Sequence, residues 1–152
     1  MTIKTIGVVG AGQMGNGIAQ VLAASGHDVI MLDVKPEFVE RGMNTIRASL
    51  DRVVKKGKLT EGDAKAALAR IKATTSYADL KSCDLAIEAA TENYAVKCKI
   101  FSELDAALRP DALLASNTSS ISITKLAATT KRPKQFMGMH FMNPVPVMQL
   151  VE

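Results

Sequence analysis

The 152-residue chain is 47% hydrophobic and 22% charged, a composition typical of one globular domain that excludes a disordered or fibrous protein. Its formal net charge is +4 and only 4% of its residues are aromatic, so a nucleic-acid partner is not expected and anionic small molecules suit the charge better. Two histidines and two separated cysteines are too few for a zinc site, and no apolar stretch approaches the length of a membrane span.

The predicted elements alternate between strands and helices along the whole chain. Residues 3–9 form a buried strand rich in β-branched residues, and the helix after the following glycine-rich turn is closed by Gly26. Later strands are predicted at 28–33, 72–75, 84–89, 112–117 and 135–141. Later helices are predicted from Pro36 to Gly57, over 59–71 with Thr60 as N-cap, over 94–108 and over 122–128. We therefore expect one α/β domain over residues 1–152, Rossmann-type and doubly wound, with a mostly parallel sheet covered by helices on both faces.

A glycine-rich turn lies between the first strand and the first helix. It matches the dinucleotide-binding pattern GxGxxG with the residues Gly10, Gly12, Gln13, Met14 and Gly15. The first glycine permits a tight turn, the second lets a pyrophosphate approach the backbone, and the third lets the helix pack on the strand. The helix N-terminus offers free amides and a partial positive charge to the phosphates. The alternative is a glycine-rich turn that binds no ligand. It is disfavoured because a strand precedes the turn and a helix follows it at the positions that the pattern requires.

Asp33 closes the second strand, where an acid can accept hydrogen bonds from the adenine ribose hydroxyls. The same carboxylate would repel a 2′-phosphate, which favours NAD over NADP. Lys35 follows two residues later and can relax that preference. The predicted cofactor is therefore NAD.

Four stretches occur together in the order and spacing of a known family: VVGAGQMGNGIAQ, IEAATEN, SNTSS and HFMNPVP. Over its whole length the chain resembles the L-3-hydroxyacyl-CoA dehydrogenases, and their 3-hydroxybutyryl-CoA branch in particular. The resemblance implies NAD-linked interconversion of (S)-3-hydroxyacyl-CoA and 3-oxoacyl-CoA, with an acyl-CoA such as acetoacetyl-CoA as the partner.

The same resemblance assigns roles to individual residues. His140 would be the general acid/base, Glu152 the carboxylate that orients it, and Ser119 a hydrogen-bond donor to the reacting substrate oxygen. The residues that would help to hold the dinucleotide and the catalytic loops are Glu92, Lys97, Asn117 and Asn143. The residues that would contact the CoA phosphates are Lys55, Lys56 and Lys58.

Each catalytic assignment has a plainer alternative. Without the family motif, a single histidine such as His140 on an apolar strand is more often a core residue; an imidazole, however, can take up and release a proton near neutral pH. The twelve residues up to Glu152 allow a strand, a Pro-Val-Pro turn and a returning strand that bring the pair together. Ser119 could cap the short helix that follows, while no GxSxG elbow surrounds it to indicate a nucleophile.

The charged groups outside the catalytic set also allow two interpretations. Glu88 and Glu92 flank the loop after the strand at 84–89, where carboxylates more often accept hydrogen bonds from sugar hydroxyls or a lysine than act in acid/base catalysis. The lysines at 55–58 end a long helix, where pairing with the helix dipole is as good an explanation as CoA binding.

Members of the family carry a second, helical domain that supplies a further substrate-site asparagine and most of the dimer interface. Residues 1–152 do not include it, so we expect the isolated domain to be weakly active or inactive, and monomeric with an exposed apolar patch, whereas the complete enzyme is expected to be a homodimer. Cys83 and Cys98 form no CxxC pair, and the first strand leaves no room for a signal peptide, so a cytoplasmic protein is expected. A non-catalytic NAD-binding module and a dehydrogenase of free hydroxy acids are the alternatives.

Overall fold

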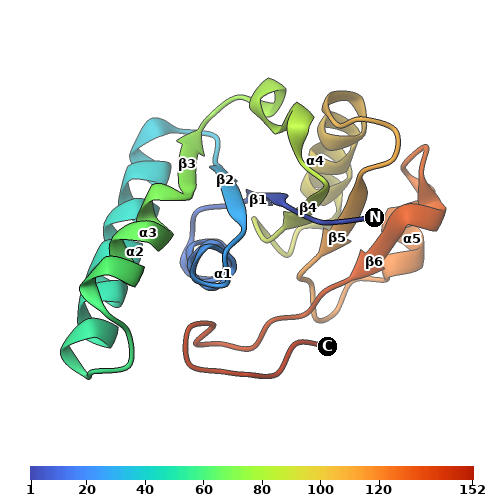
Figure 1. Ribbon diagram of the computed structural model, residues 1–152. Helices are drawn as coiled ribbons and strands as arrows, with labels where there is room; N and C mark the ends of the chain where they lie inside the picture. The colour runs from blue at the N-terminus through green and yellow to red at the C-terminus, as the bar shows by residue number, and fades with distance from the viewer.

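The computed structural model describes residues 1–152 and contains one six-stranded sheet in the order β3-β2-β1-β4-β5-β6 (Figure 1). Its strands are β1 (Thr5–Val9), β2 (Asp28–Leu32), β3 (Ile71–Thr74), β4 (Leu85–Glu88), β5 (Leu113–Ser116) and β6 (Phe136–Gly138). All neighbouring strands are parallel. The predicted Rossmann-type sheet is thereby confirmed, and the strand order reverses between β1 and β4, where doubly wound folds bind ligands.

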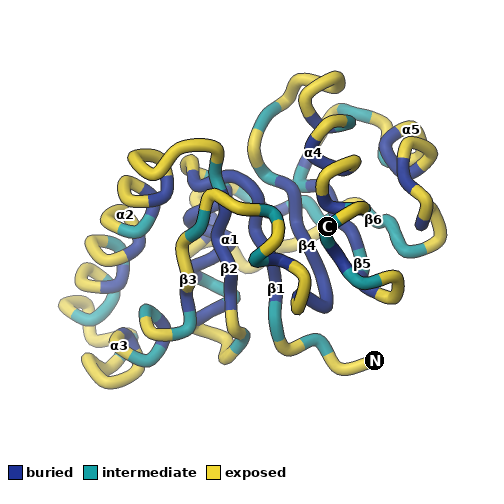
Figure 2. Tube along the Cα trace, turned by 90° about the horizontal axis from the view of Figure 1, so that it is seen from above, coloured by how far each residue is buried: buried dark blue, intermediate teal, exposed yellow.

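Helices cover both faces of the sheet, as the alternating pattern predicts. One group consists of α1 (Gln13–Ala24), α2 (Pro36–Lys55) and α3 (Glu61–Ala69), at the left in Figure 1. The other consists of α4 (Tyr94–Ala107), α5 (Ile123–Ala128) and the 3-10 helix η1 (Tyr77–Ser82). Two buried clusters result, one on each face, with the central strands buried along most of their length (Figure 2). None of these helices has the length and apolar character needed to cross a membrane.

The predicted elements differ from the observed ones mainly at the ends and in the last strand. The 3-10 helices η1 and η2 (Pro133–Gln135) were not predicted. The strand expected at 135–141 stops at Gly138, because the chain leaves the sheet edge there and turns back on itself. His140 therefore lies just beyond the strand, not on it.

The segment after β6 returns as predicted, but it pairs at a single point. Phe141 and Val151 form one antiparallel bridge. Next to it the His140 amide donates to the Glu152 carbonyl over 2.8 Å, and the Glu152 amide donates to the His140 carbonyl over 2.9 Å. These backbone bonds hold the two residues opposite each other.

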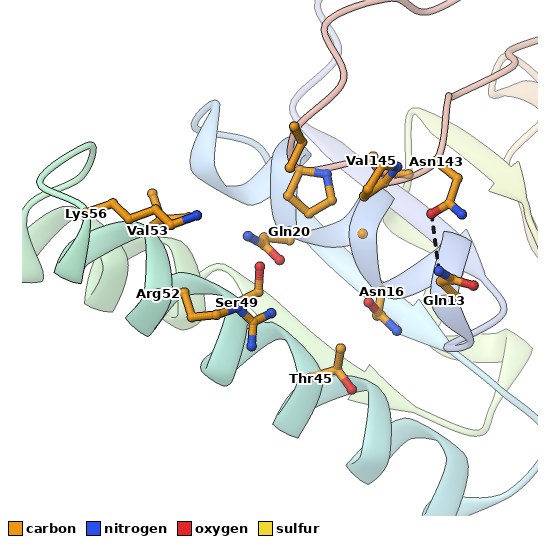
Figure 3. Close-up of a pocket in the computed structure, with 14 residues that line it drawn as sticks. Gln13, Asn16, Gln20, Thr45, Ser49, Arg52, Val53, Lys56, Asn143 and Val145 are labelled. Carbon is orange, nitrogen blue, oxygen red and sulfur yellow. Dashed lines mark hydrogen bonds between the residues drawn. The ribbon is translucent and has the colours of Figure 1, made fainter.

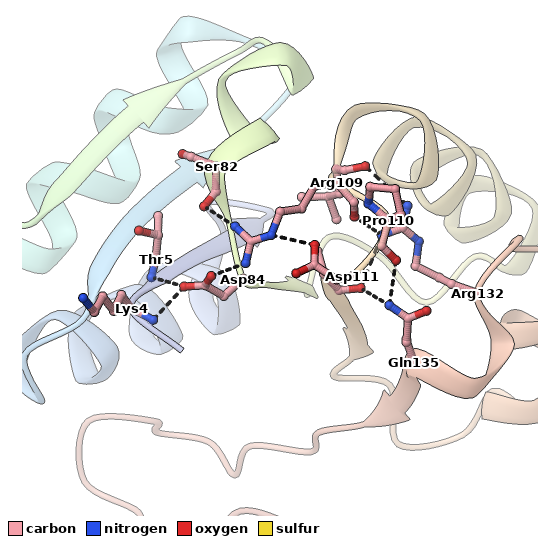
Figure 4. A network of polar contacts seen from close by, with 11 residues as sticks. Lys4, Thr5, Ser82, Asp84, Arg109, Pro110, Asp111, Arg132 and Gln135 are labelled. Carbon is pink, nitrogen blue, oxygen red and sulfur yellow. Dashed lines mark hydrogen bonds and ion pairs between the residues drawn. The ribbon is translucent and has the colours of Figure 1, made fainter. Parts of the chain in front are cut away.

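Ion pairs stabilise the end of the sheet at which the strands begin (Figure 4). Asp84, just before β4, accepts hydrogen bonds from the amides of Lys4 (2.7 Å) and Thr5 (2.9 Å) and pairs with Arg109. The Arg109 guanidinium, together with the two amides, lowers the pKa of Asp84 to about 2. This network lies at the opposite end of β4 from the glycine-rich turn.

Candidate functional site

The glycine-rich turn has the geometry that dinucleotide binding requires. Gly10 has φ 108°, and a Cβ there would lie 2.6 Å from the Ala89 carbonyl oxygen. A Cβ on Gly15 would lie 1.8 Å from the Gly10 carbonyl oxygen, because α1 packs directly on the turn. A Cβ on Gly12 would meet nothing within 4 Å, so the backbone there is open to a ligand.

The N-terminus of α1 is free to bind an anion. Its N-cap is Gly12, and no side chain caps it, whereas Thr60, Asn93 and Ser122 cap α3, α4 and α5. The unpaired amides at the start of a twelve-residue helix and the open space beside Gly12 fit a pyrophosphate. These observations support the predicted cofactor.

Asp33 lies where the ribose contact is predicted. Its carboxylate accepts hydrogen bonds from the amides of Ala11 (2.8 Å) and Val34 (2.7 Å), which fix it against the glycine turn. Together with Gly10 it lines a cavity of about 430 Å³, here called the Asp33 cavity. Tyr77 forms part of the wall; burial, followed by nearby carboxylates, raises the pKa of Tyr77 to about 12, so its hydroxyl stays neutral.

A second cavity, of about 260 Å³ and here called the Lys97 cavity, lies on the other side of the turn. It collects most of the remaining residues predicted to bind the cofactor: Gly12, Gln13, Met14, Glu92, Lys97 and Asn117. Asn143 is not among them, although its Oδ1 accepts a hydrogen bond from Gln13 Nε2 over 3.2 Å. The two cavities thus lie on either side of the phosphate-binding turn, where the two halves of a dinucleotide would lie.

Lys97 is buried against Glu88 at the end of β4. Their exposed fractions are 1% and 0%, and Lys97 Nζ lies 2.5 Å from Glu88 Oε1. Of the two uses expected for the carboxylate of Glu88, pairing with a lysine is therefore the observed one. Acid/base catalysis by Glu88 and Glu92 as a pair is not supported, because Glu88 is enclosed.

Hydrogen bonds connect the loops after β4, β5 and β6. Glu92 Oε2 accepts from the hydroxyls of Thr118 (2.8 Å) and Ser120 (3.2 Å). Asn117 Oδ1 accepts from the amide of Phe141 over 2.8 Å. Glu92 and Asn117, which line the Lys97 cavity, therefore hold the loops together, one of the two roles that the resemblance implies.

Ser119 does not cap the helix that follows it. Ser122 does, because its hydroxyl accepts from the Lys125 amide, and the alternative of Ser119 as a cap is therefore wrong. Ser119 is exposed on the loop that Asn117 ties to the segment carrying His140. The position leaves the hydroxyl available to a substrate.

His140 and Glu152 meet through their side chains as well as their backbones. His140 Nδ1 lies 3.1 Å from Glu152 Oε2, with 30% and 62% of the side chains exposed. An ionised carboxylate can only accept, so we assign the Nδ1 proton to this contact. The other ring nitrogen, Nε2, then remains free. His140 is not a core residue.

Large apolar side chains near this pair are exposed: Val147, Met148, Leu150 and Val151. An apolar patch at this place is expected if a second domain docks beside His140 and Glu152. That docking stays a prediction.

The three lysines assigned to CoA are all exposed, at and just beyond the end of α2. Lys56 lines a groove of about 270 Å³ between α1, α2 and residues 143–147, here called the α1–α2 groove (Figure 3). Lys55 instead lines a hollow between α2 and α3, and Lys58 lines neither. The contact of these three lysines with CoA stays a prediction, and Lys56 is the one that lines the α1–α2 groove.

Sequence reasoning missed several residues of the groove. One face of α2 presents Thr45, Ser49 and Arg52 to it, and the C-cap residue Lys56 continues the same helical spacing. That spacing was visible in the sequence and would have separated Lys56 from Lys55. Gln20, which is 4% exposed, also lines the groove, and no sequence motif indicated that position (Figure 3).

The chain matches the family model described as "3-hydroxyacyl-CoA dehydrogenase, NAD binding domain" over residues 5–152. It is 56% identical over 150 residues to a 3-hydroxybutyryl-CoA dehydrogenase of Bradyrhizobium diazoefficiens, covering 99% of this chain and 51% of the relative. Against the crystal structure of (S)-3-hydroxybutyryl-CoA dehydrogenase PaaH1 from Ralstonia eutropha, the TM-score is 0.97 at 58% identity, covering 99% and 53%. The chain thus spans about half the length of these relatives.

Proposed function

Because the chain belongs to the 3-hydroxyacyl-CoA dehydrogenase family, as its NAD-binding domain, we propose that it is the cofactor half of an enzyme that moves a hydride between NAD(H) and C3 of an acyl-CoA. The substrates are an (S)-3-hydroxyacyl-CoA and the corresponding 3-oxoacyl-CoA. The observation that carries the proposal is the 3.1 Å contact between His140 and Glu152, just past the carboxyl end of the parallel sheet that carries the dinucleotide turn.

The proposed chemistry needs a proton at the C3 oxygen. A nicotinamide cofactor held by the glycine-rich turn and Asp33 would supply the hydride chemistry at the carbon, as the acceptor when oxidised (NAD⁺) and as the donor when reduced (NADH). His140 Nε2 takes the proton from the hydroxyl or returns it to the oxo group, while Glu152 holds Nδ1 and stabilises the imidazolium. The hydroxyl of Ser119 donates a hydrogen bond to the same oxygen and stabilises the charge that develops there.

The CoA end of the substrate belongs, in this proposal, in the α1–α2 groove. Arg52 and Lys56 place two positive charges along one side of it, which suits phosphates. Val145 and its neighbours at 143–147 form the opposite wall and connect the groove to His140 along the chain. The apolar part of the wall suits the pantetheine arm.

We further propose that the complete enzyme is a homodimer in which the second domain supplies most of the interface. The exposed apolar side chains between Val147 and Val151 support this arrangement, since they need a covering surface.

The test joins residues 1–152 to the second half of the Bradyrhizobium relative and follows NADH consumption with acetoacetyl-CoA. His140→Gln should lower kcat by about 10²–10⁴-fold while NADH affinity stays unchanged. A His140→Gln protein that keeps the wild-type rate would contradict the assignment.

The same assay separates the alternatives. A non-catalytic NAD-binding module would bind NADH and show no turnover in the joined protein. A dehydrogenase of free hydroxy acids would turn over acetoacetate at least as well as acetoacetyl-CoA.

A further inference from the structure

The buried ion pair between Glu88 and Lys97 has no part in the proton chemistry above. Glu88 ends β4 and Lys97 lies in the first turn of α4, so two elements meet at this contact. The pair is enclosed, with 0% and 1% of the side chains exposed. Burying a charge costs free energy unless the charge is paired, and even a buried ion pair often adds no net stability. A role other than stabilisation is therefore expected for this pair.

The carboxylate of Glu88 is 0% exposed and accepts three hydrogen bonds from within the chain. Oε1 accepts from Lys97 Nζ (2.5 Å) and from the hydroxyl of Ser116 (2.8 Å), and Oε2 accepts from the amide of Ala90 (2.9 Å). Glu88 therefore cannot itself contact a ligand. Its hydrogen bonds fix the ends of β4 and β5 and the loop that follows β4.

Lys97, in contrast, has donors to spare. An ammonium group carries three N–H bonds, and Glu88 accepts one of them. Lys97 also lines the Lys97 cavity, together with Gly12 and Asn117. Since Asp33 marks the ribose of the adenosine half in the other cavity, the Lys97 cavity faces the nicotinamide half of the dinucleotide.

We propose that Glu88 is a positioning residue for the cofactor: it holds the ammonium group of Lys97 at the wall of the Lys97 cavity, so that the remaining donors face the ribose hydroxyls of the nicotinamide half. The inference rests on the proposed function, because it requires a dinucleotide in that cavity. Glu88 acts only through Lys97 and is not a catalytic residue.

Asp84, the residue just before the same strand, provides a matched control. It is also a carboxylate in an ion pair, with Arg109, but it precedes β4 and lies at the end of the sheet away from the glycine turn (Figure 4). Asp84→Asn therefore destabilises the chain without touching the cavity. Any loss of cofactor binding that is only a consequence of lower stability should appear in this variant too.

The experiment measures NADH binding by the fluorescence of NADH, AMP binding by calorimetry, and the Tm of each variant. The variants are Glu88→Gln, Lys97→Met, the double variant with both changes, and Asp84→Asn. AMP reports the adenosine half alone. The double variant replaces a buried ion pair by neutral side chains, which often restores stability.

Glu88→Gln and Lys97→Met should each weaken NADH binding by about tenfold, with AMP binding unchanged. In the double variant Tm should recover while NADH binding stays about tenfold weaker. Asp84→Asn should lower Tm and leave NADH binding at the wild-type level.

Four outcomes would overturn the inference. If the double variant regains NADH binding together with Tm, or if Glu88→Gln weakens AMP and NADH binding equally, Glu88 has a structural role only. If Glu88→Gln binds NADH as wild type does, the positioning role alone fails. If the folded wild-type chain binds no NADH, the proposed function fails as well.

Discussion

The Asp84 network permits a quantitative prediction about acid stability. Its carboxylate is paired with Arg109 and with two backbone amides, and the pKa of Asp84 is lowered from 3.8 to about 2. A shift of this size corresponds to about 2 kcal/mol of folding free energy. Because 36% of the Arg109 side chain is exposed, solvent screens part of the interaction. We therefore expect Asp84→Asn to lower the free energy of unfolding at pH 7 by about 1–2 kcal/mol.

The sign of the pH dependence follows from the direction of the shift. A carboxyl group whose pKa is lowered by folding contributes its full stabilisation above the unfolded pKa and loses it as the pH falls through the folded one. The gap between wild type and Asp84→Asn should thus be constant at neutral pH, narrow below 3.8 and close near 2.

Urea unfolding followed by far-ultraviolet circular dichroism, from pH 7 down to the acid limit of the folded state, measures this gap. Asp111→Asn is the control: Asp111 pairs with the same arginine over 2.8 Å but is 63% exposed, so its removal should cost less than about 0.5 kcal/mol. A gap that stays constant into strong acid would refute the ion-pair explanation.

Three further predictions concern the proposed substrate site and the 143–147 segment beside it. Ser119→Ala in the joined two-domain protein should lower kcat by about 10–100-fold with NADH affinity unchanged; an equal loss of both would indicate a structural role. Lys56→Ala should raise the KM for acetoacetyl-CoA by about tenfold. Lys55→Ala removes an equal charge from the hollow between α2 and α3 and should leave this KM unchanged. Gly17→Ala would place a Cβ 2.9 Å from Val145 Cβ and push the 143–147 segment off α1. The turnover rate of the joined protein should therefore fall more than its NADH affinity does. A turnover rate equal to that of wild type would show that the segment shifts without consequence.

The fold class could be predicted because each signal is local. A β-branched run, a glycine turn and a capped amphipathic helix each depend on neighbours a few residues away, and their alternation leaves few topologies other than a parallel sheet with helices on both faces. Asp33 and the glycines could be assigned for the same reason, since the turn, the strand end and the helix N-terminus follow one another along the chain.

What the sequence determined, then, is the type of each element, the dinucleotide turn and, through the family motifs, which residues to examine. Tertiary structure alone decided that Lys97 is enclosed with Glu88, that Lys56 and Lys55 line different hollows, and that His140 lies beyond β6. These facts depend on distances between segments far apart in the chain, and they are set by how helices and loops pack against the sheet. Local patterns carry no information on that packing, because the same short sequence can lie beside many different neighbours.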